Sequence, residues 1–295
     1  MALSPQVVAI PLYLGLMALE LVEVRRESRE EAERGTPARM IGYEPKDTAT
    51  SLTMGIGSLV VGAIFAGIAL AFSFWFYDRR LLDLGDVAAG GSGIALAVAA
   101  WAILVLLDDL CYYWFHRVHH ESRFFWAAHV THHSSQKYNL STALRQSWTP
   151  LTSLPFYIPV FLLGFTPAQW AFVHGINLVY QFWIHTEAID RMWRPFELVM
   201  NTPSHHRVHH GSNPQYLDRN YGGILIVWDR LFGSFEPEGE RVRYGLTRNI
   251  DSYNPFYVAY HEFGAIGRDV ASASSWADRW RFVFANPGWA YSRKA

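Results

Sequence analysis

The sequence predicts an all-α integral membrane protein with a histidine-rich cytosolic cap. Hydrophobic residues make up 51% of its 295 positions and charged residues only 17%, which is low for a soluble protein. Most of the 13 histidines fall in clusters just outside long uncharged stretches. We therefore expect about three full spans plus a helical hairpin, which together make four to five transmembrane helices.

Four stretches contain no Asp, Glu, Lys or Arg: residues 1–19, 48–77, 87–107 and 146–186. A helical span needs roughly 20 apolar residues, so the first three stretches predict spans at about 7–24, 52–76 and 93–115. The fourth predicts a tight hairpin over residues 150–186, because Gly164-Phe165-Thr166-Pro167 is a turn signal in its middle. The arms of this hairpin are short for a complete crossing. A signal peptide is disfavoured at the start, because no basic residue precedes the apolar run.

Basic residues set the orientation of these spans. The loop between the first two spans carries six of them: Arg25, Arg26, Arg29, Arg34, Arg39 and Lys46. The next loop carries only Arg79 and Arg80. The positive-inside rule places the first loop in the cytoplasm and the N-terminus outside. Three spans then return the chain to the cytoplasm at His116, so we expect the cap to be cytoplasmic.

Three histidine clusters share the pattern His-x-x-His-His. They are His116, His119 and His120, then His129, His132 and His133, and finally His206, His209 and His210. Residues at i, i+3 and i+4 share one face of a helix, so each cluster can aim imidazoles at one point. Neutral imidazole suits iron, zinc and copper, and nine histidines exceed the coordination of a single ion, which favours two metal ions. The alternatives, ordinary polar histidines or a loose metal-sequestering tract, do not account for this repetition beside apolar spans.

Asp109 and Glu121 are candidate catalytic residues. Asp109 lies on the stripe that leads from the third span into the first cluster, where it could orient a ligating imidazole. The alternative is a carboxylate at the level of the lipid headgroups. Glu121 is a candidate ligand, a neighbour of a ligand or a plain surface residue. We expect His119 and His205 to bond neighbouring residues. The expected metal ligands are His116, His120, His129, His132, His133, His185, His206, His209 and His210.

We predict one domain over residues 1–295. It comprises membrane spans over 1–115, a histidine-rich catalytic region over 116–236 and a C-terminal cap or interfacial segment over 237–295. Within the second part, residues 221–228 have a strand-like composition. The C-terminal segment is rich in Trp and Tyr, which favours a place at the membrane surface.

Several other kinds of site are excluded. The single cysteine, Cys111, excludes a disulfide framework and a cysteine-based zinc site. Neither His120-Glu121 nor His261-Glu262 continues to His-Glu-x-x-His, so the zincin signature is missing. No Glu is followed three residues later by His, as a soluble di-iron carboxylate bundle would require. The net charge of −1 gives no sign of a nucleic-acid partner.

The histidine pattern resembles that of a known family. The motifs similar to those of the fatty acid hydroxylase (sterol desaturase) superfamily of membrane di-iron oxygenases are His116-x-x-x-His120, His129-x-x-His132-His133 and His206-x-x-His209-His210. Longer strings resemble the alkylglycerol monooxygenase group within that superfamily, among them Asp109-x-x-Tyr112-Tyr113-Trp114, Asn201-Thr202-Pro203-Ser204-His205 and Asn220-Tyr221-Gly222-Gly223. The resemblance is dense over residues 100–236.

That resemblance implies a helical membrane enzyme with two iron ions that uses O2. It further implies hydroxylation of the carbon next to the ether oxygen of a glyceryl ether lipid, with tetrahydrobiopterin or another electron donor as the reductant. The hemiacetal then separates into a fatty aldehyde and glycerol. The expected partners are the lipid substrate, O2 and the electron donor, and the sequence predicts no oligomeric state.

The leading hypothesis is therefore a lipid C–H hydroxylase that cleaves glyceryl ethers. A desaturase or hydroxylase acting on a sterol, a carotenoid or a fatty acyl chain is the alternative, and it predicts the same metal site. A membrane metal-binding or transport protein is disfavoured, because a carrier needs ligands along a path through its spans. The hairpin can line a channel for the apolar chain, and lipid-facing packing is the alternative for each of its aromatic side chains. The side chains suited to the channel wall are Phe156, Tyr157, Phe161, Phe165, Trp170, Phe172, Tyr180, Phe182 and Trp183.

Overall fold

Helices account for the regular structure of residues 4–293, which are the residues that this computed structural model describes. The all-α expectation is confirmed, because the strand-like pairing in that range is limited to two isolated bridges, Met200 with Leu225 and Gly211 with Tyr244. The first helices are α1 Pro5–Val8, α2 Ile10–Arg34, α3 Pro45–Tyr77, α4 Leu84–Ala88, α5 Ile94–Glu121 and α6 Arg123–His133. The 3-10 helices η1 Leu140–Leu144, η2 Pro150–Thr152 and η3 Leu154–Tyr157 follow. The remaining helices are α7 Ile158–Leu162, α8 Pro167–Trp183, α9 Arg194–Val199, α10 Pro203–His209, α11 Val227–Phe232, α12 Pro255–Ser272, α13 Trp276–Phe284 and α14 Pro287–Ser292.

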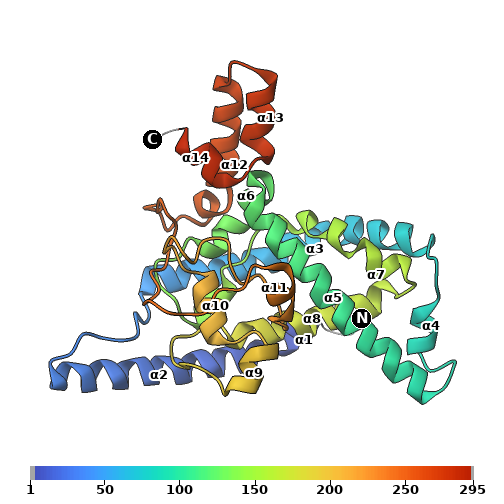
Figure 1. Ribbon diagram of the computed structural model, residues 1–295, viewed down its shortest axis with the longest axis horizontal. Helices are drawn as coiled ribbons and strands as arrows, with labels where there is room; N and C mark the ends of the chain where they lie inside the picture. Colours follow the sequence, from blue (N-terminus) through green and yellow to red (C-terminus); the bar gives the residue numbers. More distant parts are fainter. Residues whose placement is uncertain (1–3, 294–295) are drawn as a thin grey trace.

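Helices α3 and α5, which we call the α3–α5 pair, are each long and apolar enough to cross a bilayer. Among the described residues they are the two helices with the length and apolarity for a span, with mean hydropathies of 2.3 and 2.2. Their apolar side chains point outwards, as Ile64 of α3 and Val98 of α5 are 71% and 61% exposed. The connection between them, with α4, lies at one end of the molecule, away from α9, α10 and α11 (Figure 1). Apolar faces of this size are suited to lipid contact.

Residues 150–186 form the predicted hairpin, with its turn at Gly164. The arms are η2, η3 and α7 on one side and α8 on the other. Its tip is fixed to the connection between α3 and α5, because the N–H groups of Leu81 and Gly85 donate to the carbonyls of Leu162 and Gly164 at 2.7 and 3.0 Å. We call these contacts the tip clamp. The hairpin therefore extends as far along the molecule as the α3–α5 pair does.

Several aromatic residues of the hairpin pack into a core. Tyr157, Phe161 and Phe165 are fully buried and cluster with Leu104 of α5 and Val173 of α8. The expectation that the hairpin aromatics line a lipid channel is wrong for these three. The reason is that α5 packs against both arms, so their rings are buried in the core between these helices.

The predicted first span, over residues 7–24, falls on α1 and the first half of α2, which are not among the described helices that have the length and apolarity of a span. Glu20 and Glu23 lie near the end of this stretch. Glu20 is buried against the cap, where it accepts the N–H of Leu140 at 2.8 Å and the hydroxyl of Thr186. Residues 4–293 therefore contain two candidate spans, whereas we expect about three full spans from the sequence.

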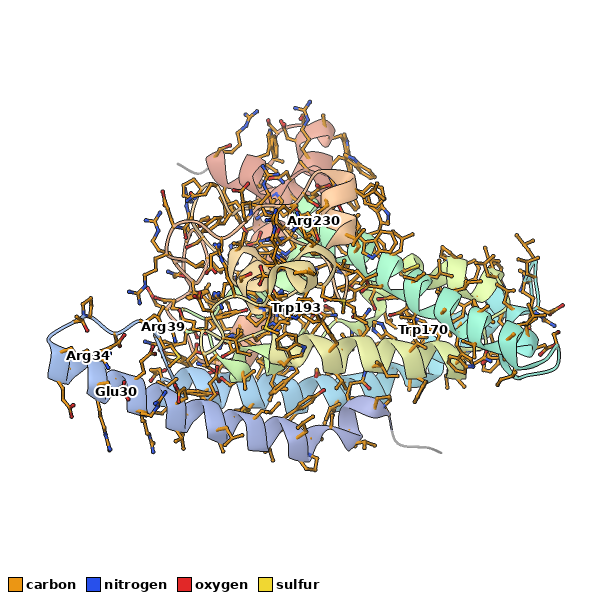
Figure 2. All side chains as sticks on the ribbon, turned by 60° about the horizontal axis from the view of Figure 1, so that its bottom comes forward. Glu30, Arg34, Arg39, Trp170, Trp193 and Arg230 are labelled. Carbon is orange, nitrogen blue, oxygen red and sulfur yellow. The ribbon has the colours of Figure 1, made fainter. Side chains whose placement is uncertain are left out.

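The second half of α2 marks a charged end of the molecule. Glu30 and Arg34 lie at the tip of α2 and Arg39 in the loop after it, while Trp170 of α8 lies at the opposite end (Figure 2). Arg34 and Glu30 form an exposed i,i+4 ion pair at 3.2 Å, which is typical of a solvated helix. The molecule thus has an aqueous end and an apolar end.

Residues 221–228 form a buried loop that runs into α11, so the strand-like interpretation is wrong. Carboxylates take the place of a neighbouring strand in satisfying the backbone. Asp229 accepts the N–H groups of Tyr221 and Gly222, both at 2.7 Å. Asp109 accepts two more N–H groups of this loop, at 2.7 and 3.0 Å.

The C-terminal helices α12, α13 and α14 project from one side of the body (Figure 1). They are joined to it by Arg123 of α6, whose side chain is fully buried. Its guanidinium pairs with Glu262 at 2.6 Å and with Asp269 at 2.7 Å, both on α12. Breaking a buried pair of this kind leaves uncompensated charge, so α6 and α12 are firmly coupled.

Gly164→Ala should destabilise the protein by opening the tip clamp. Gly164 has a φ of 86°, and a Cβ there would lie 2.0 Å from the carbonyl oxygen of Leu82. The matched control is Gly233→Ala, because Gly233 has a φ of 77° but no atom within 4 Å of its Cβ position. The control carries only the left-handed backbone cost of about 1–2 kcal/mol, so thermal unfolding in detergent should show a much larger Tm loss for Gly164→Ala. Equal losses would contradict the clamp.

Candidate metal centre

The nine predicted histidines come together at the cap end of the helices. The last turns of α5, the helix α6, and the helix α10 with the residue after it carry eight of them. The ninth, His185, follows the end of α8. All nine are buried or nearly buried. The i, i+3, i+4 spacing on α6 and α10 places the rings of each helix on one face, as the sequence pattern predicts.

The nine rings form two groups. The first histidine group comprises His116, His120, His129, His133 and His209. The second histidine group comprises His132, His185, His206 and His210. Within each group one ring nitrogen of every member lies within 4.8 Å of the others. His132 and His133 are adjacent in the chain but belong to different groups, because neighbouring residues of a helix point in different directions. His209 and His210 are divided in the same way.

Rings within a group approach each other through Nε2. In the first group, Nε2 of His129 lies 3.0 Å from that of His116 and 3.1 Å from that of His133. In the second, Nε2 of His185 lies 2.9 Å from that of His206. Such contacts bring nitrogen atoms to hydrogen-bond distance, so the position of the ring protons decides whether they attract or repel.

Backbone carbonyls fix the proton on several of these rings. Nδ1 of His116 lies 2.8 Å from the carbonyl of Tyr221, and Nδ1 of His209 lies 2.9 Å from that of Arg219. Nδ1 of His185 lies 2.7 Å from a carbonyl of α8. A carbonyl only accepts, so in these rings Nδ1 carries the proton and Nε2 keeps a lone pair that faces the group centre. Facing lone pairs repel, whereas a cation between them is coordinated, so this donor set fits metal ions.

Burial keeps these imidazoles neutral. It lowers the pKa of His185 to about 4. Burial, together with the charge of neighbouring imidazoles, lowers the pKa of His129, His133 and His206 well below the usual value. The neutral ring is the form that binds a metal, so the rings are ready to act as ligands at neutral pH.

Asp109 does not contact a histidine of either group, which corrects the expectation that it orients one directly. The Nδ1 atom of His116 is already bonded to the Tyr221 carbonyl. The carboxylate of Asp109 accepts instead from the indole of Trp228 at 2.9 Å and from two N–H groups of the loop after Tyr221. Asp109 is therefore a positioning residue for the loop whose carbonyl holds His116.

Glu121 lies outside both histidine groups. It pairs with Arg117 at 2.8 Å and its side chain is 45% exposed, which fits the surface alternative and gives no support to a ligand role. His119 bonds a carbonyl of its own helix at 2.8 Å, and His205 lies 3.4 Å from Glu197. These two histidines therefore bond neighbouring residues, as expected.

Three aromatic residues that sequence reasoning did not single out as site residues enclose the groups. The ring centres of Trp126 and Tyr221 lie 5.0 and 5.4 Å from that of His120. The ring centre of Tyr138 lies 5.1 Å from that of His210. The sequence signal that could have found Tyr221 is the glycine pair after it, because glycine permits the close backbone approach that this loop makes.

The comparison with protein families agrees with this geometry. Residues 101–234 match the model of the family described as fatty acid hydroxylase, and this stretch contains every member of both histidine groups. This part of the chain is therefore similar to the fatty acid hydroxylase family. With two helices suited to crossing a bilayer, this is an integral membrane protein whose histidine groups adjoin the ends of its apolar helices.

Individual relatives extend the likeness beyond residues 101–234. Alkylglycerol monooxygenase of Homo sapiens is 40% identical over 283 residues, which cover 95% of this chain and 59% of the human protein. Alkylglycerol monooxygenase of Xenopus tropicalis is 40% identical over 87% of this chain and 54% of its own length. Lathosterol oxidase of Mus musculus is 26% identical over 54% of this chain and 52% of its own length. The chain therefore spans between half and three fifths of these relatives. No solved structure gives a significant match.

Asp109→Asn should loosen the loop that holds His116. An amide places a donor where the carboxylate accepts several N–H groups, and hydrogen bonds to a charged group contribute roughly 1.5–3 kcal/mol each. We expect a lower Tm and a red shift of the total tryptophan emission, to which Trp228 contributes as one of 12 tryptophans. Asp78→Asn is the matched control, because Asp78 is an exposed carboxylate at the end of α3. A variant with the stability and emission of the parent would contradict this role of Asp109.

Proposed function

We propose that this protein is a membrane di-iron monooxygenase that hydroxylates a C–H bond of a lipid. The observation that carries the proposal is the convergence of unprotonated Nε2 atoms in two adjacent buried groups. Two groups of ligands fit two cations, and a set of neutral imidazoles is compatible with iron. The similarity to the fatty acid hydroxylase family over residues 101–234 supports this reaction class.

Each histidine group would hold one iron ion through the Nε2 atoms of its members. Bound iron would supply the activation of O2 that attack on an unactivated C–H bond requires and that amino acid side chains cannot supply. The chain's own contribution is orientation and exclusion of water. The carbonyls of Tyr221 and Arg219 retain the Nδ1 protons of His116 and His209, so that their Nε2 atoms face inwards. Burial of the rings keeps bulk water from the reacting atoms.

We propose a glyceryl ether lipid as the substrate, hydroxylated at the carbon next to the ether oxygen. The likeness to alkylglycerol monooxygenases over most of the chain supports this choice. The weaker likeness to lathosterol oxidase gives less support to a sterol. The product is a hemiacetal, which separates into a fatty aldehyde and a glycerol lipid. Tetrahydrobiopterin is the proposed electron donor.

The catalytic side is proposed to face the cytoplasm. The basic residues in the second half of α2 and in the loop after it, namely Arg25, Arg26, Arg29, Arg34 and Arg39, support this orientation through the positive-inside rule. Arg39 of that loop lies at the charged end of the molecule, opposite Trp170 (Figure 2). The histidine groups lie where α5 and α8 end, on the side towards this loop.

Cells that express the chain should deplete an alkylglycerol supplied in the medium and accumulate the matching fatty aldehyde and fatty acid, measured by lipid mass spectrometry. The control is the His132→Ala, His133→Ala double variant, in which both groups lose a member. Unchanged ether lipid alongside an altered sterol or acyl lipid would reject the glyceryl ether and favour the alternative substrates.

Single variants should separate the two proposed ions. His132→Ala removes a member of the second group and His133→Ala a member of the first. Each should lower the iron content of the purified protein by about half and abolish turnover, because a buried ion needs its full ligand set. His261→Ala is the control, since His261 lies outside both groups and bonds the Val258 carbonyl at 3.1 Å. Full iron content in both single variants would overturn the ligand assignment.

A further inference from the structure

A polar cleft lies beside the second histidine group. Its walls come from residues 37–39, 187–191 and 238–244 together with Arg207 of α10, and its volume is about 470 Å³. That volume falls in the range of roughly 300–1,000 Å³ that is typical of small-molecule sites. The cleft lies next to the loop after α2, at the charged end of the molecule where Arg39 is labelled (Figure 2).

The walls of the polar cleft suit a polar molecule rather than a lipid chain. They contain four arginines and four carboxylates, and the aliphatic contribution is limited to Pro37 and Val242. The charges balance, and some of them already pair within the wall, as Arg207 does with Glu238 at 2.7 Å, so the cleft lacks the excess positive charge that a polyphosphate would require. A neutral or zwitterionic heterocycle with both donors and acceptors fits these walls.

A pair of tyrosines connects the polar cleft to the second histidine group. Tyr244 is part of the cleft wall, and its ring stacks on Tyr138 with centres 4.6 Å apart and planes within 2°. Tyr138 is 1% exposed, and its ring centre lies 5.1 Å from that of His210 and 6.0 Å from that of His185. Two ring contacts therefore lead from the cleft to the rings of that group.

Hydrogen bonds hold both tyrosine rings in place. The hydroxyl of Tyr138 donates to the carbonyl of Ile184 at 3.1 Å, and that of Tyr244 donates to Glu187 at 3.3 Å. Both rings are therefore held in a fixed, stacked position between the cleft and the second histidine group.

We propose that the polar cleft binds the electron donor and that the Tyr244–Tyr138 stack conducts its electrons to the second histidine group. This inference rests on the proposed function. Hydroxylation consumes the substrate RH, one O2, two electrons and two protons, and yields ROH and water. The two electrons come from a polar reduced heterocycle of the tetrahydropterin class, which is oxidised to the dihydropterin level as it gives them up. The lipid approaches from the apolar helices instead, so donor and substrate enter from different sides.

Binding is tested on the full chain, with and without iron, by anaerobic isothermal titration calorimetry with tetrahydrobiopterin. Gly239→Leu fills the cleft from its wall, and the backbone tolerates it because the nearest atom to a Cβ there is the Tyr216 hydroxyl at 3.8 Å. We expect its Kd to rise at least about tenfold. Gly267→Leu on α12 is the control, since nothing lies within 4 Å of its Cβ position. An unchanged Kd in Gly239→Leu would overturn the donor site, and displacement of the pterin by a short-chain lipid headgroup would assign the cleft to the substrate.

The route is tested by stopped-flow reduction of the iron-loaded protein. Tyr244→Leu should slow reduction by tetrahydrobiopterin about tenfold, which corresponds to about 1.4 kcal/mol, while Tyr244→Phe should recover most of the rate because it keeps the stacked ring. Reduction by dithionite, a small ion that needs no cleft, should be alike in all three proteins. Equal pterin rates in Tyr244→Leu and the parent would overturn the route.

These measurements distinguish the proposed donor cleft from the proposed di-iron function. Failure of the chain to bind iron would reject the proposed di-iron centre. Full iron content and normal dithionite reduction, with no effect at Gly239 or Tyr244, would reject only the donor cleft and its tyrosine pair. If Tyr244→Leu fails to fold, Gly239→Leu still tests the cleft through the binding constant.

Discussion

The structure depends on holding unprotonated imidazole nitrogens face to face. Buried neutral rings whose Nε2 lone pairs point at one another repel unless a cation lies between them, so the arrangement must be enforced by the surrounding chain. Carbonyls of α8, of Arg219 and of Tyr221 retain the Nδ1 protons. The Tyr221 loop in turn is held by carboxylates of Asp109 and Asp229. These acidic residues therefore act on the site indirectly: they hold the backbone of the loop, and the loop holds the imidazole ring.

Buried ion pairs maintain the cap around those rings. Arg145 is 1% exposed and pairs with Asp47 at the start of α3 at 3.0 Å. Arg207, which follows His206 on α10, pairs with Glu238 at 2.7 Å. Each pair joins a histidine-bearing region to a different part of the chain. Because removal of one partner strands a buried charge, these pairs resist any loosening of the cap more than they add to net stability.

The sequence predictions that agree with the structure rest on the local spacing of residues. The spacing on α6 and α10 predicted rings on one face, and the turn signal at Gly164 predicted the hairpin. The division of His132 from His133 was beyond the sequence, because it depends on how α6 faces α10 across a long separation in the chain. The prediction that Asp109 orients an imidazole is wrong for a similar reason. Its hydrogen-bond partners come from a distant loop whose composition resembles that of a strand. The span predicted over residues 7–24 rests on apolarity alone, which does not reveal that Glu20 is buried in the cap.

The tip clamp has a mechanical consequence. Lipid bilayers differ in thickness, and helices respond to a mismatch by tilting. The α3–α5 pair and the 150–186 hairpin are fastened together at the ends farthest from the cap, so one cannot lean without the other. α5 delivers His116 to the first group, and α8 leads into His185 of the second. When the helices and the hairpin tilt together, the distance between the two histidine groups stays constant. The same metal centre can then operate in bilayers of different thickness.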